Sequence, residues 1–468
     1  MLFSLTQRGL DALCGSTRLG AYSKGCERID RDIGHLAQPQ PCKKGVKMSL
    51  FRVDLNEVFT PRRAKVNRKM YETRPELEKA LRNALEGSVH PMLFGESGNG
   101  KSWLYKTVFE DVRVPYVVVN CASIAGIKSL SGALLSAVVK PGTSVSVSFS
   151  EEKSAGVKAV VAEGGLKHTE NYEVAKPEPI LRAFSMLSKE HGQKRSVIVL
   201  DNLEAIFDLP ELVSEIANAI ILLDDERYAE HNIRFLLVGT PSCVLRFFSR
   251  SPNLHSVSNR VRELPKVGSL GEESTNALVT RGFQEFLKVK ISDLELKKLC
   301  RYVYFVTMGV AQRVHELCQE IALQLRDNGW RYEERLLENA EREWISMGLR
   351  DSYVTIESNM NSRRSRVARR DQVIYAIGQV EGHQFDSSEI ESLVKINFPA
   401  TVPKSGVLGT GAILSELARA RGPEDKPLLD KDPKTNQYTI LDPRHIMCIR
   451  IIIHKDKNGR LVRKKFRI

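Results

Sequence analysis

The segment FGESGNGKS, residues 94–102, constrains the fold of this chain more than any other stretch. It matches the pattern G-x-x-x-x-G-K-[ST], with Gly95, Gly100, Lys101 and Ser102 at the four fixed positions. Glycines let backbone N–H groups turn inward around a phosphate, and the helix that follows points its positive N-terminus at the same anion. The flanking HPMLF and WLYKTVFE are typical of the strand and helix that this pattern requires. The sequence therefore predicts a phosphate-binding loop in an α/β sheet.

Each part of this loop has a predicted role in binding ATP and Mg²⁺. Lys101 is placed to reach the β- and γ-phosphates, and the Ser102 hydroxyl to bind Mg²⁺. Asp201 ends the apolar stretch SVIVLD, so its carboxylate would lie beside the loop at the carboxyl edge of a parallel sheet, on the Mg²⁺ side. The alternative is that Asp201 only caps the next helix. The predicted cofactor-binding residues are Gly95, Glu96, Ser97, Gly98, Asn99, Gly100, Lys101, Ser102 and Asp201, with Ser102 and Asp201 as the metal ligands.

The residue after Asp201 raises the question of whether the bound ATP is hydrolysed. It is Asn202, whose amide can orient a water molecule but cannot accept its proton. Glu204 follows two residues later and has a carboxylate that can accept one. Two interpretations of Glu204 are equally compatible with the sequence: a displaced catalytic base, or a plain surface residue.

The chain of 468 residues is too long for one ordinary domain, and its patterning changes along its length. Strands alternate with helices as far as about residue 266, which indicates a parallel sheet, and the pattern then becomes wholly helical. The predicted units are a disordered leader or mis-assigned start at 1–47, a nucleotide-binding core at 48–266 with a β-hairpin insert at about 143–172, a helical region at 267–350, and a third unit at 351–468.

The third unit has the pattern of a winged helix. RDQVIYAIGQ, FDSSEIESLVKI and GAILSELARARG read as three helices, and PLLDKDPKTNQYTIL as two strands around a polar turn. The third helix, 411–421, would enter a major groove, led by Ser415 and Arg419. The arginine cluster at 363–370 and the basic tail at 455–467 suit phosphate contacts, although many winged helices contact only proteins.

Charge and cysteine content indicate which cellular environment and which kinds of partner the sequence favours. The net charge is +13, and residues 351–468 hold 21 basic and 14 acidic side chains, so the basic excess gathers toward this end. A basic C-terminal unit of this kind favours a polyanionic partner. The simpler interpretation is that the basic side chains only improve solubility. The eight cysteines are scattered without a CxxC pair, which is typical of reduced thiols in a cytoplasmic protein. No run of 18 apolar residues occurs, so we expect no membrane partner.

The order of these motifs resembles that of the AAA+ ATPases, in particular the origin-recognition initiators and the transposon target-selection ATPases. The motifs are the phosphate loop, VIVLD, IRFLLVGTPS, VSNRVRELP and MGVAQRVHELC, within about residues 50–350 and more loosely the C-terminal unit. TRPELEKAL, with Arg74 and Glu76, resembles the family's segment near the adenine. The resemblance implies a P-loop NTPase (AAA+) with a parallel sheet covered by helices on both faces, a helical lid and a C-terminal winged-helix domain.

The resemblance also assigns roles to single residues. Thr240 falls at the family's first sensor, which contacts the attacking water or the γ-phosphate, and Arg313 falls at the second sensor in the lid. Arg260, with Arg262 as the alternate, falls at the arginine finger that reaches the nucleotide of a neighbouring subunit. The simpler interpretations are a turn cap for Thr240 and surface ion pairs for the arginines. The implied catalytic set is Glu204, Asn202, Thr240, Arg260 and Arg313.

The function that the resemblance implies is a slow, Mg²⁺-dependent ATP hydrolase that forms homo-oligomers and acts on DNA or on a DNA-bound partner. Asn202 departs from the family, which has an acid at this position, and this argues against fast hydrolysis. The competing hypothesis is a signal-transduction NTPase switch of the STAND-like type. Such a switch holds nucleotide and controls a separate protein effector without needing DNA, so stimulation by DNA distinguishes the two hypotheses.

Overall fold

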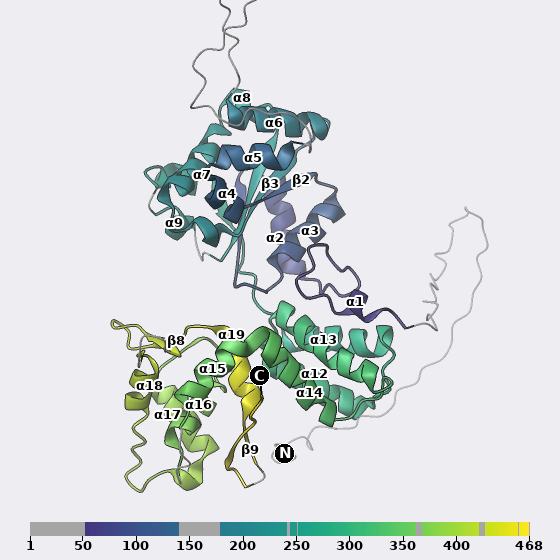
Figure 1. The fold of residues 1–468 in the computed structure, drawn as a ribbon. Helices are drawn as coiled ribbons and strands as arrows, with labels where there is room; N and C mark the ends of the chain where they lie inside the picture. The colour runs from purple at the N-terminus through teal and green to yellow at the C-terminus, as the bar shows by residue number, and fades with distance from the viewer. Residues whose placement is uncertain are drawn as a thin grey trace, which may run out of the picture.

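The computed structural model describes residues 52–139, 178–240, 244–249, 251–361, 367–420, 426–456 and 458–467. The leader expected at 1–47 and the β-hairpin insert expected at 143–172 lie outside these ranges, as do residues 362–366 of the arginine cluster. Figure 1 shows the sheet-containing domain at the top, with the helical region and the C-terminal domain packed together below it.

The core of the upper domain is a five-stranded parallel sheet in the order β2-β3-β4-β1-β5. The strands are β1 (His90–Phe94), β2 (Tyr116–Asn120), β3 (Ser196–Asp201), β4 (Ile233–Gly239) and β5 (Val261–Glu263). The four longer strands confirm the stretches that the sequence indicated. The short β5 was not predicted as a strand, because only Val261 of its three residues is buried and the apolar pattern is correspondingly weak.

Helices cover both faces of the sheet, and this explains why β3 is apolar without a break. Val197 and Val199 face α2 (Pro75–Glu86) and α3 (Lys101–Val112), whereas Ile198 and Leu200 face the other helix layer. The other layer contains α4 (Cys121–Ile127), α5 (Leu130–Val138), α6 (Pro179–Glu190) and α7 (Pro210–Leu222). Three short helices complete the domain: α8 (Glu226–Ala229), α9 (Val244–Phe247) and α10 (Leu254–Ser258).

The lid follows the sheet and is wholly helical, as the sequence indicated. It contains α11 (Glu272–Thr280), the π-helical turn η2 (Arg281–Phe286), α12 (Asp293–Thr307), α13 (Ala311–Asp327) and α14 (Arg335–Trp344). The start of α12 is determined by a reciprocal capping box between Ser292 and Glu295. The N-terminal segment with α1 (Leu55–Val58) packs into this lid, where the rings of Phe59 and Phe283 lie 5.0 Å apart.

The sequence placed a domain boundary between residues 350 and 351, and the structure has a helical connection there. α14 passes through the π-helical turn η3 (Ile345–Leu349) directly into α15 (Arg350–Asn359), with no loop between them. The apolar side chains of the lid and of the C-terminal domain also form one continuous core. The guanidinium of Arg450 donates across this junction to the carbonyl of Phe305, and within its own domain to the carbonyls of Gly378 and Val380.

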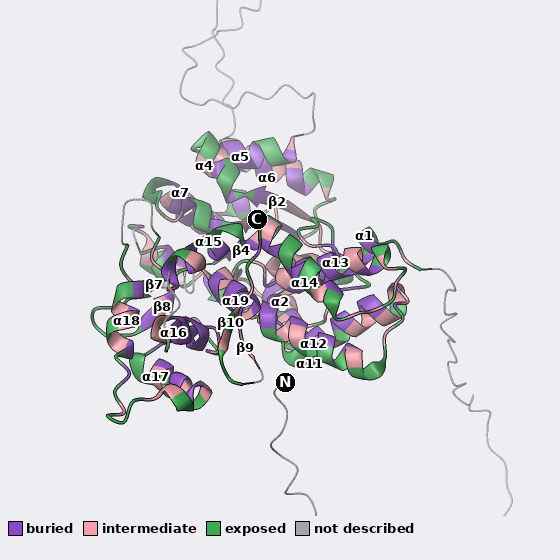
Figure 2. Cartoon of the chain, turned by 60° about the horizontal axis from the view of Figure 1, so that its bottom comes forward, coloured by how far each residue is buried: buried purple, intermediate pink, exposed green. Residues whose placement is uncertain are grey.

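The C-terminal domain contains the elements from which the sequence predicted a winged helix. They are α16 (Arg369–Ile377), α17 (Ser387–Asn397), α18 (Thr410–Leu417) and a hairpin of β7 (Leu429–Lys431) and β8 (Tyr438–Ile440). The structure adds β6 (Gln384–Phe385), the 3₁₀ turn η4 (Pro399–Thr401), α19 (Pro443–Ile452) and a second hairpin of β9 (Ile453–Lys455) and β10 (Leu461–Arg463). Figure 2 shows α16 and α19 buried over most of their surface.

Within the described ranges, no single helix has the length and apolar character needed to cross a membrane. The pair α4 and α5 passes the same test only when the two are taken together, and they are bent by 117° at their junction.

Two glycines with left-handed backbones provide a matched test of the lid's packing. Gly309 (φ +67°) follows α12, and a Cβ there would lie 2.0 Å from the carbonyl oxygen of Leu270. Gly329 (φ +63°) follows α13 and has no atom within 4 Å of an added Cβ. We expect Gly329→Ala to cost about 1 kcal/mol of backbone strain, and Gly309→Ala about 3 kcal/mol or more, because the backbone must also move. Thermal unfolding of the two variants measures this, and equal shifts in Tm would contradict the lid packing described here.

Candidate functional site

The loop between β1 and α3 has a backbone that only glycine adopts without strain. Gly95, Gly98 and Gly100 have φ values of +155°, +84° and +86°. A Cβ at Gly95 would lie 2.3 Å from the carbonyl oxygen of Val267, so this side of the loop is closed by the chain that follows β5. The loop ends at the N-terminus of α3, a twelve-residue helix whose dipole favours an anion there. The structure therefore forms the phosphate cradle that the sequence pattern requires.

Lys101 lies against this loop and has anionic neighbours. Its ammonium group donates to the carbonyl oxygens of Gly95 (2.8 Å) and Glu96 (3.0 Å). Burial lowers the pKa of Lys101, while the carboxylates of Glu204 and Asp201 act in the opposite direction. The lysine is thus held at the loop by weak acceptors, from which it can turn to phosphate oxygens.

Ser102 and Asp201 meet as the sequence predicted. The Ser102 hydroxyl donates to Oδ2 of Asp201 over 3.2 Å, and the backbone N–H of Asn202 donates to Oδ1 over 3.0 Å. Hydroxyl and carboxylate oxygens are ligands that Mg²⁺ prefers, so this pair fits the expected ion. No group of three or more His, Cys, Asp or Glu in the described parts of the chain is placed to hold a metal.

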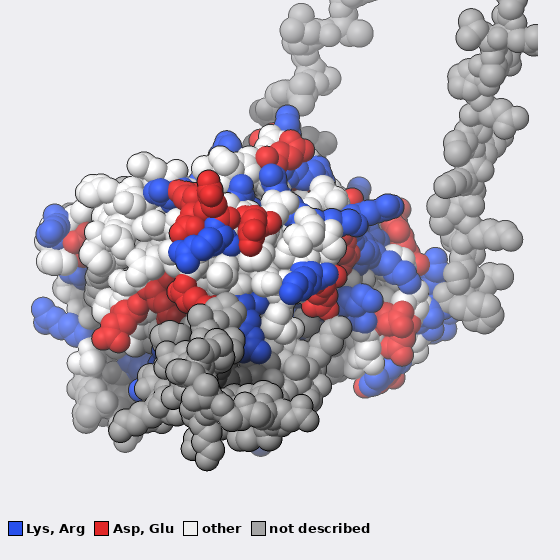
Figure 3. Space-filling model, turned by 90° about the horizontal axis from the view of Figure 1, so that it is seen from above, with Lys and Arg blue, Asp and Glu red and all other residues white. Residues whose placement is uncertain are grey.

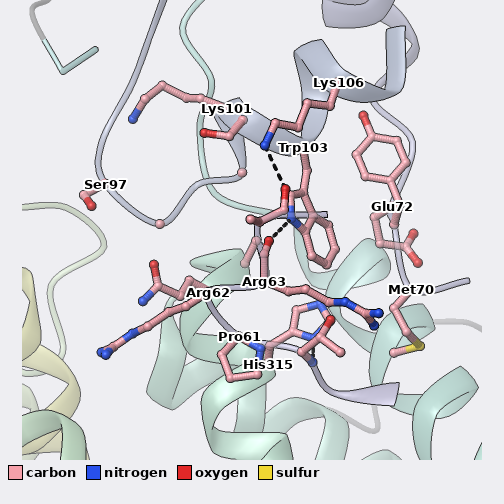
Figure 4. Close-up of a pocket in the computed structure, with 18 of the residues that line it drawn as sticks. Pro61, Arg62, Arg63, Met70, Glu72, Ser97, Lys101, Trp103, Lys106 and His315 are labelled. Atoms are coloured by element: carbon pink, nitrogen blue, oxygen red, sulfur yellow. Dashed lines mark hydrogen bonds between the residues drawn. The ribbon is translucent and has the colours of Figure 1, made fainter. Parts of the chain in front are cut away.

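A cavity of about 350 Å³ opens beside this loop. Its walls come from residues 60–74, the loop and the start of α3, the end of β3, the last turn of α11 and the first turns of α13 (Figure 4). Lys101, Ser102 and Asp201 line one part of it, and apolar side chains line another: Met70, Trp103, Leu270, Leu278 and Ala311. This polarity suits a molecule with a charged end and a flat apolar end, as a nucleotide has.

Two aromatic residues that the sequence analysis did not select shape this cavity. Trp103 donates its indole N–H to the carbonyl of Arg63 (3.0 Å), and Nδ1 of His315 accepts the backbone N–H of Thr60 (3.2 Å), as Figure 4 shows. The two rings lie 5.6 Å apart, nearly perpendicular. Burial lowers the pKa of His315 to about 4, so the ring is neutral. The only signal in the sequence was that Trp103 directly follows Ser102.

The lid contacts the loop through Gln312 rather than through Arg313. The backbone N–H of Gln312 donates to the carbonyl of Gly98 over 3.0 Å, and Gln312 and His315 line the cavity. Arg313, expected at the second sensor, lies on another face of α13 and pairs with Glu316 over 2.6 Å. Residues 312 and 315 share a helix face because they are three apart, whereas residue 313 is turned about 100° away from residue 312.

Glu204 and Thr240 are brought together at the cavity. Both Asn202 and Glu204 line it, and the backbone N–H of Thr240 donates to Oε2 of Glu204 over 3.1 Å. Asn202 has a left-handed backbone (φ +63°), which turns the chain from β3 into the 3₁₀ turn η1 (Leu203–Ile206) that carries Glu204. Glu204 is an exposed side chain that lines the cavity, so both interpretations, the displaced base and the plain surface residue, remain predictions.

Arg260 does not reach this cavity within its own chain. It precedes β5, whose pairing of Val261 with His90 places it at the amino edge of the sheet, opposite the loop. Its guanidinium donates to Asp224 (2.6 Å) and to the carbonyl of Ser256 (2.6 Å). Within one chain this is the ion pair that the simpler interpretation expected, and the arginine-finger role remains a prediction about a neighbouring subunit.

The C-terminal domain also contacts the phosphate loop. The carboxylate of Glu96 lies between Lys266 (2.8 Å) and Nε2 of His383 (3.3 Å), which precedes β6. Burial would raise the pKa of Glu96, but these two partners outweigh it and lower the pKa. A loop residue is thus linked to a side chain 287 positions away in the sequence.

Much of the basic surface expected to bind DNA is paired within the protein. Arg370 pairs with Glu416 (2.6 Å), Arg463 with Asp371 (2.6 Å) and Lys464 with Glu341 (2.6 Å). In α18, the expected recognition helix, the hydroxyl of Ser415 bonds to that of Tyr438, and the helix ends at Leu417, before Arg419. Basic and acidic side chains are interspersed also on the upper side of the molecule, which Figure 3 shows from above. The described part of these clusters therefore offers fewer unpaired cations than the sequence count indicated.

The position of Trp103 provides a direct test of the cavity. We expect added ATP to change the fluorescence emission of this indole, because it lines the cavity next to the loop. Trp103→Phe should abolish most of the change, whereas Trp330→Phe should retain it, since Trp330 lies in the lid away from the cavity lining. An ATP-dependent signal that survives in Trp103→Phe would contradict this placement.

Comparisons with known proteins support the fold. Residues 86–247 match the family model described as an AAA domain. A search of curated proteins found no match. Similar solved structures include the Walker-type ATPase PABY2304 of Pyrococcus abyssi, with 16% identity, a TM-score of 0.44, and 82% of this chain and 97% of that chain covered. They also include the Aeropyrum pernix ORC1 protein in complex with DNA, with 15% identity, a TM-score of 0.39, and 84% of this chain and 97% of that chain covered. Cdc6p from Pyrobaculum aerophilum has 13% identity and a TM-score of 0.38, with 86% of this chain and 98% of that chain covered.

The strand order, the glycine loop between β1 and α3 and the match to the AAA domain model agree with one another. The upper domain has the fold of an AAA+ P-loop NTPase, and residues 86–247 within it match an AAA domain.

Proposed function

We propose that this protein binds ATP with Mg²⁺, hydrolyses it slowly, forms homo-oligomers and acts on DNA or on a DNA-bound partner. The observation that carries the ATPase part is that Lys101, the Ser102–Asp201 pair and Glu204 line one cavity. Ser102 and Asp201 would hold Mg²⁺, which neutralises charge on the phosphates when it is bound. Lys101 contributes a second positive charge to the same oxygens.

Glu204 is the residue that we assign as the general base. Its carboxylate can accept the proton of an attacking water, and Asn202, which also lines the cavity, can orient that water. The backbone N–H of Thr240 donates to Oε2 of Glu204 and helps to place this carboxylate at the cavity. Asn202 occupies the position directly after Asp201 and cannot itself accept that proton, and this supports slow turnover.

Steady-state ATPase activity of single variants tests this assignment. We expect Glu204→Gln to lower kcat by about 10²–10⁴-fold, the usual contribution of a positioned base, while ATP binding is retained. Lys101→Ala should lose binding itself, because it removes a cation from the phosphate site. Asn202→Glu, which places an acid directly after Asp201, is the matched control. A Glu204→Gln enzyme with unchanged kcat, or an Asn202→Glu enzyme that gains activity, would contradict the role of Glu204.

The same assay with and without duplex DNA, at low and moderate salt, separates the two functional hypotheses. Stimulation that weakens as salt rises supports action on DNA. A protein that binds ATP, barely turns over and ignores DNA would be a switch for a separate protein effector. Two observations favour this second candidate: the internal pairing of Arg370 and Arg463, and the contact of His383 with Glu96.

The oligomer part of the proposal depends on Arg260. In an oligomer its guanidinium would exchange Asp224 for the nucleotide of a neighbour. We expect Lys101→Ala and Arg260→Ala each to lack activity alone, and their mixture to regain part of it. Mixed oligomers contain some interfaces at which an intact loop meets an intact arginine. Mixing that restores nothing, with both variants folded and assembled, would contradict a role in trans.

A further inference from the structure

Tyr105 is a buried residue of α3 whose hydroxyl points at the predicted metal site. Its side chain is fully buried, and its O–H donates to Oδ2 of Asp201 over 3.3 Å. The Ser102 hydroxyl donates to the same oxygen over 3.2 Å. Ser102 and Tyr105 are three residues apart on one face of the helix, so both hydroxyls reach the same carboxylate.

The ring of Tyr105 has an ordinary packing role, but its hydroxyl does not. The ring lies 5.6 Å from that of Phe109 and 6.3 Å from that of Tyr116, within the apolar layer between α3 and the sheet. Phenylalanine would fill this space equally well. A hydroxyl buried in such a layer is unfavourable unless it is hydrogen-bonded, and the partner here is the carboxylate of Asp201.

The donors around Asp201 determine how its carboxylate is oriented. Two hydroxyls hold Oδ2, and the backbone N–H of Asn202 holds Oδ1. Rotation of the carboxylate about its last side-chain bond would break these contacts together. A tyrosine phenol is protonated at neutral pH, so this hydroxyl acts as a donor to the carboxylate.

We propose that Tyr105 is a positioning residue for Mg²⁺: it holds Asp201 in the orientation that accepts the ion, without touching nucleotide or metal itself. This inference rests on the nucleotide site proposed above and adds a residue to its metal side. The effect should appear in the Mg²⁺ requirement, because Asp201 faces the ion, and not in the binding of ATP without metal.

Tyr105→Phe tests this inference, since it removes one oxygen atom and keeps the ring. We expect ATP affinity in EDTA to be unchanged and the Mg²⁺ concentration for half-saturation to rise on the order of 10-fold, the usual effect of losing a hydrogen bond to a charged group. Tyr116→Phe is the matched control, because it removes a hydroxyl from the same aromatic cluster without contacting Asp201, and should behave as wild type.

Two readouts measure ATP binding and the Mg²⁺ requirement without relying on turnover. Trp103 fluorescence follows ATP binding first in EDTA and then during a Mg²⁺ titration. Electron paramagnetic resonance with Mn²⁺ in place of Mg²⁺ counts the bound ion directly. An unchanged metal titration for Tyr105→Phe would overturn the proposal, and so would an equal loss of ATP affinity with and without metal, which is the result of a purely structural role.

A double-mutant cycle with Asp201→Asn provides the second test. Once the carboxylate has become an amide, the Tyr105 hydroxyl no longer supports a metal-binding orientation, so adding Tyr105→Phe should have no further effect on the Mg²⁺ requirement. Additive effects would overturn the proposal. A wild-type protein that binds no ATP in either condition would overturn the nucleotide site itself. A wild type with normal Mg²⁺-dependent binding and an unaffected Tyr105→Phe would overturn only the role of Tyr105.

Discussion

The parallel pairing of β1, β4 and β3 is the constraint on which the site depends. β4 pairs with both neighbours, so that Leu237 lies opposite Met92 on one side and Leu200 on the other. The carboxyl ends of β1 and β3 therefore reach the same edge, and the loop after Phe94 faces Asp201 across one strand. A shift of β3 by one residue would turn Asp201 to the opposite face and separate it from Ser102.

The parts of this arrangement that the sequence predicted are those determined by local pattern. The four long strands, the glycine loop and the Ser102–Asp201 pair follow from apolar runs and from fixed spacings, which tertiary packing does not change. Trp103 and His315 could not be assigned in this way, because their roles depend on residues 60–64 folding across α3 and α13. The role of Arg313 as second sensor remains a prediction, and in the structure its guanidinium pairs with Glu316 of the same helix.

Charge counts along the sequence predicted a basic appendage, and the structure shows why such counts overestimate a binding surface. A count treats every arginine as available, whereas Arg370 and Arg463 lie beside acids that are 46 and 92 positions away in the chain. The boundary predicted near residue 350 raises a similar point, because α14 continues there through η3 into α15 without a loop. A change of pattern marks where one set of elements ends, but it does not show whether the helix on either side is interrupted.

The shared core of the lid and the C-terminal domain reduces the mechanical freedom of the chain. With one apolar core below the sheet and no loop between α14 and α15, the described molecule has two bodies rather than three. Opening the cavity means separating Gln312 from Gly98, and His383 leaves Glu96 in the same movement, because both belong to the lower body. The two contacts, one from the lid and one from the C-terminal domain, thus join the same phosphate loop to a single apolar core.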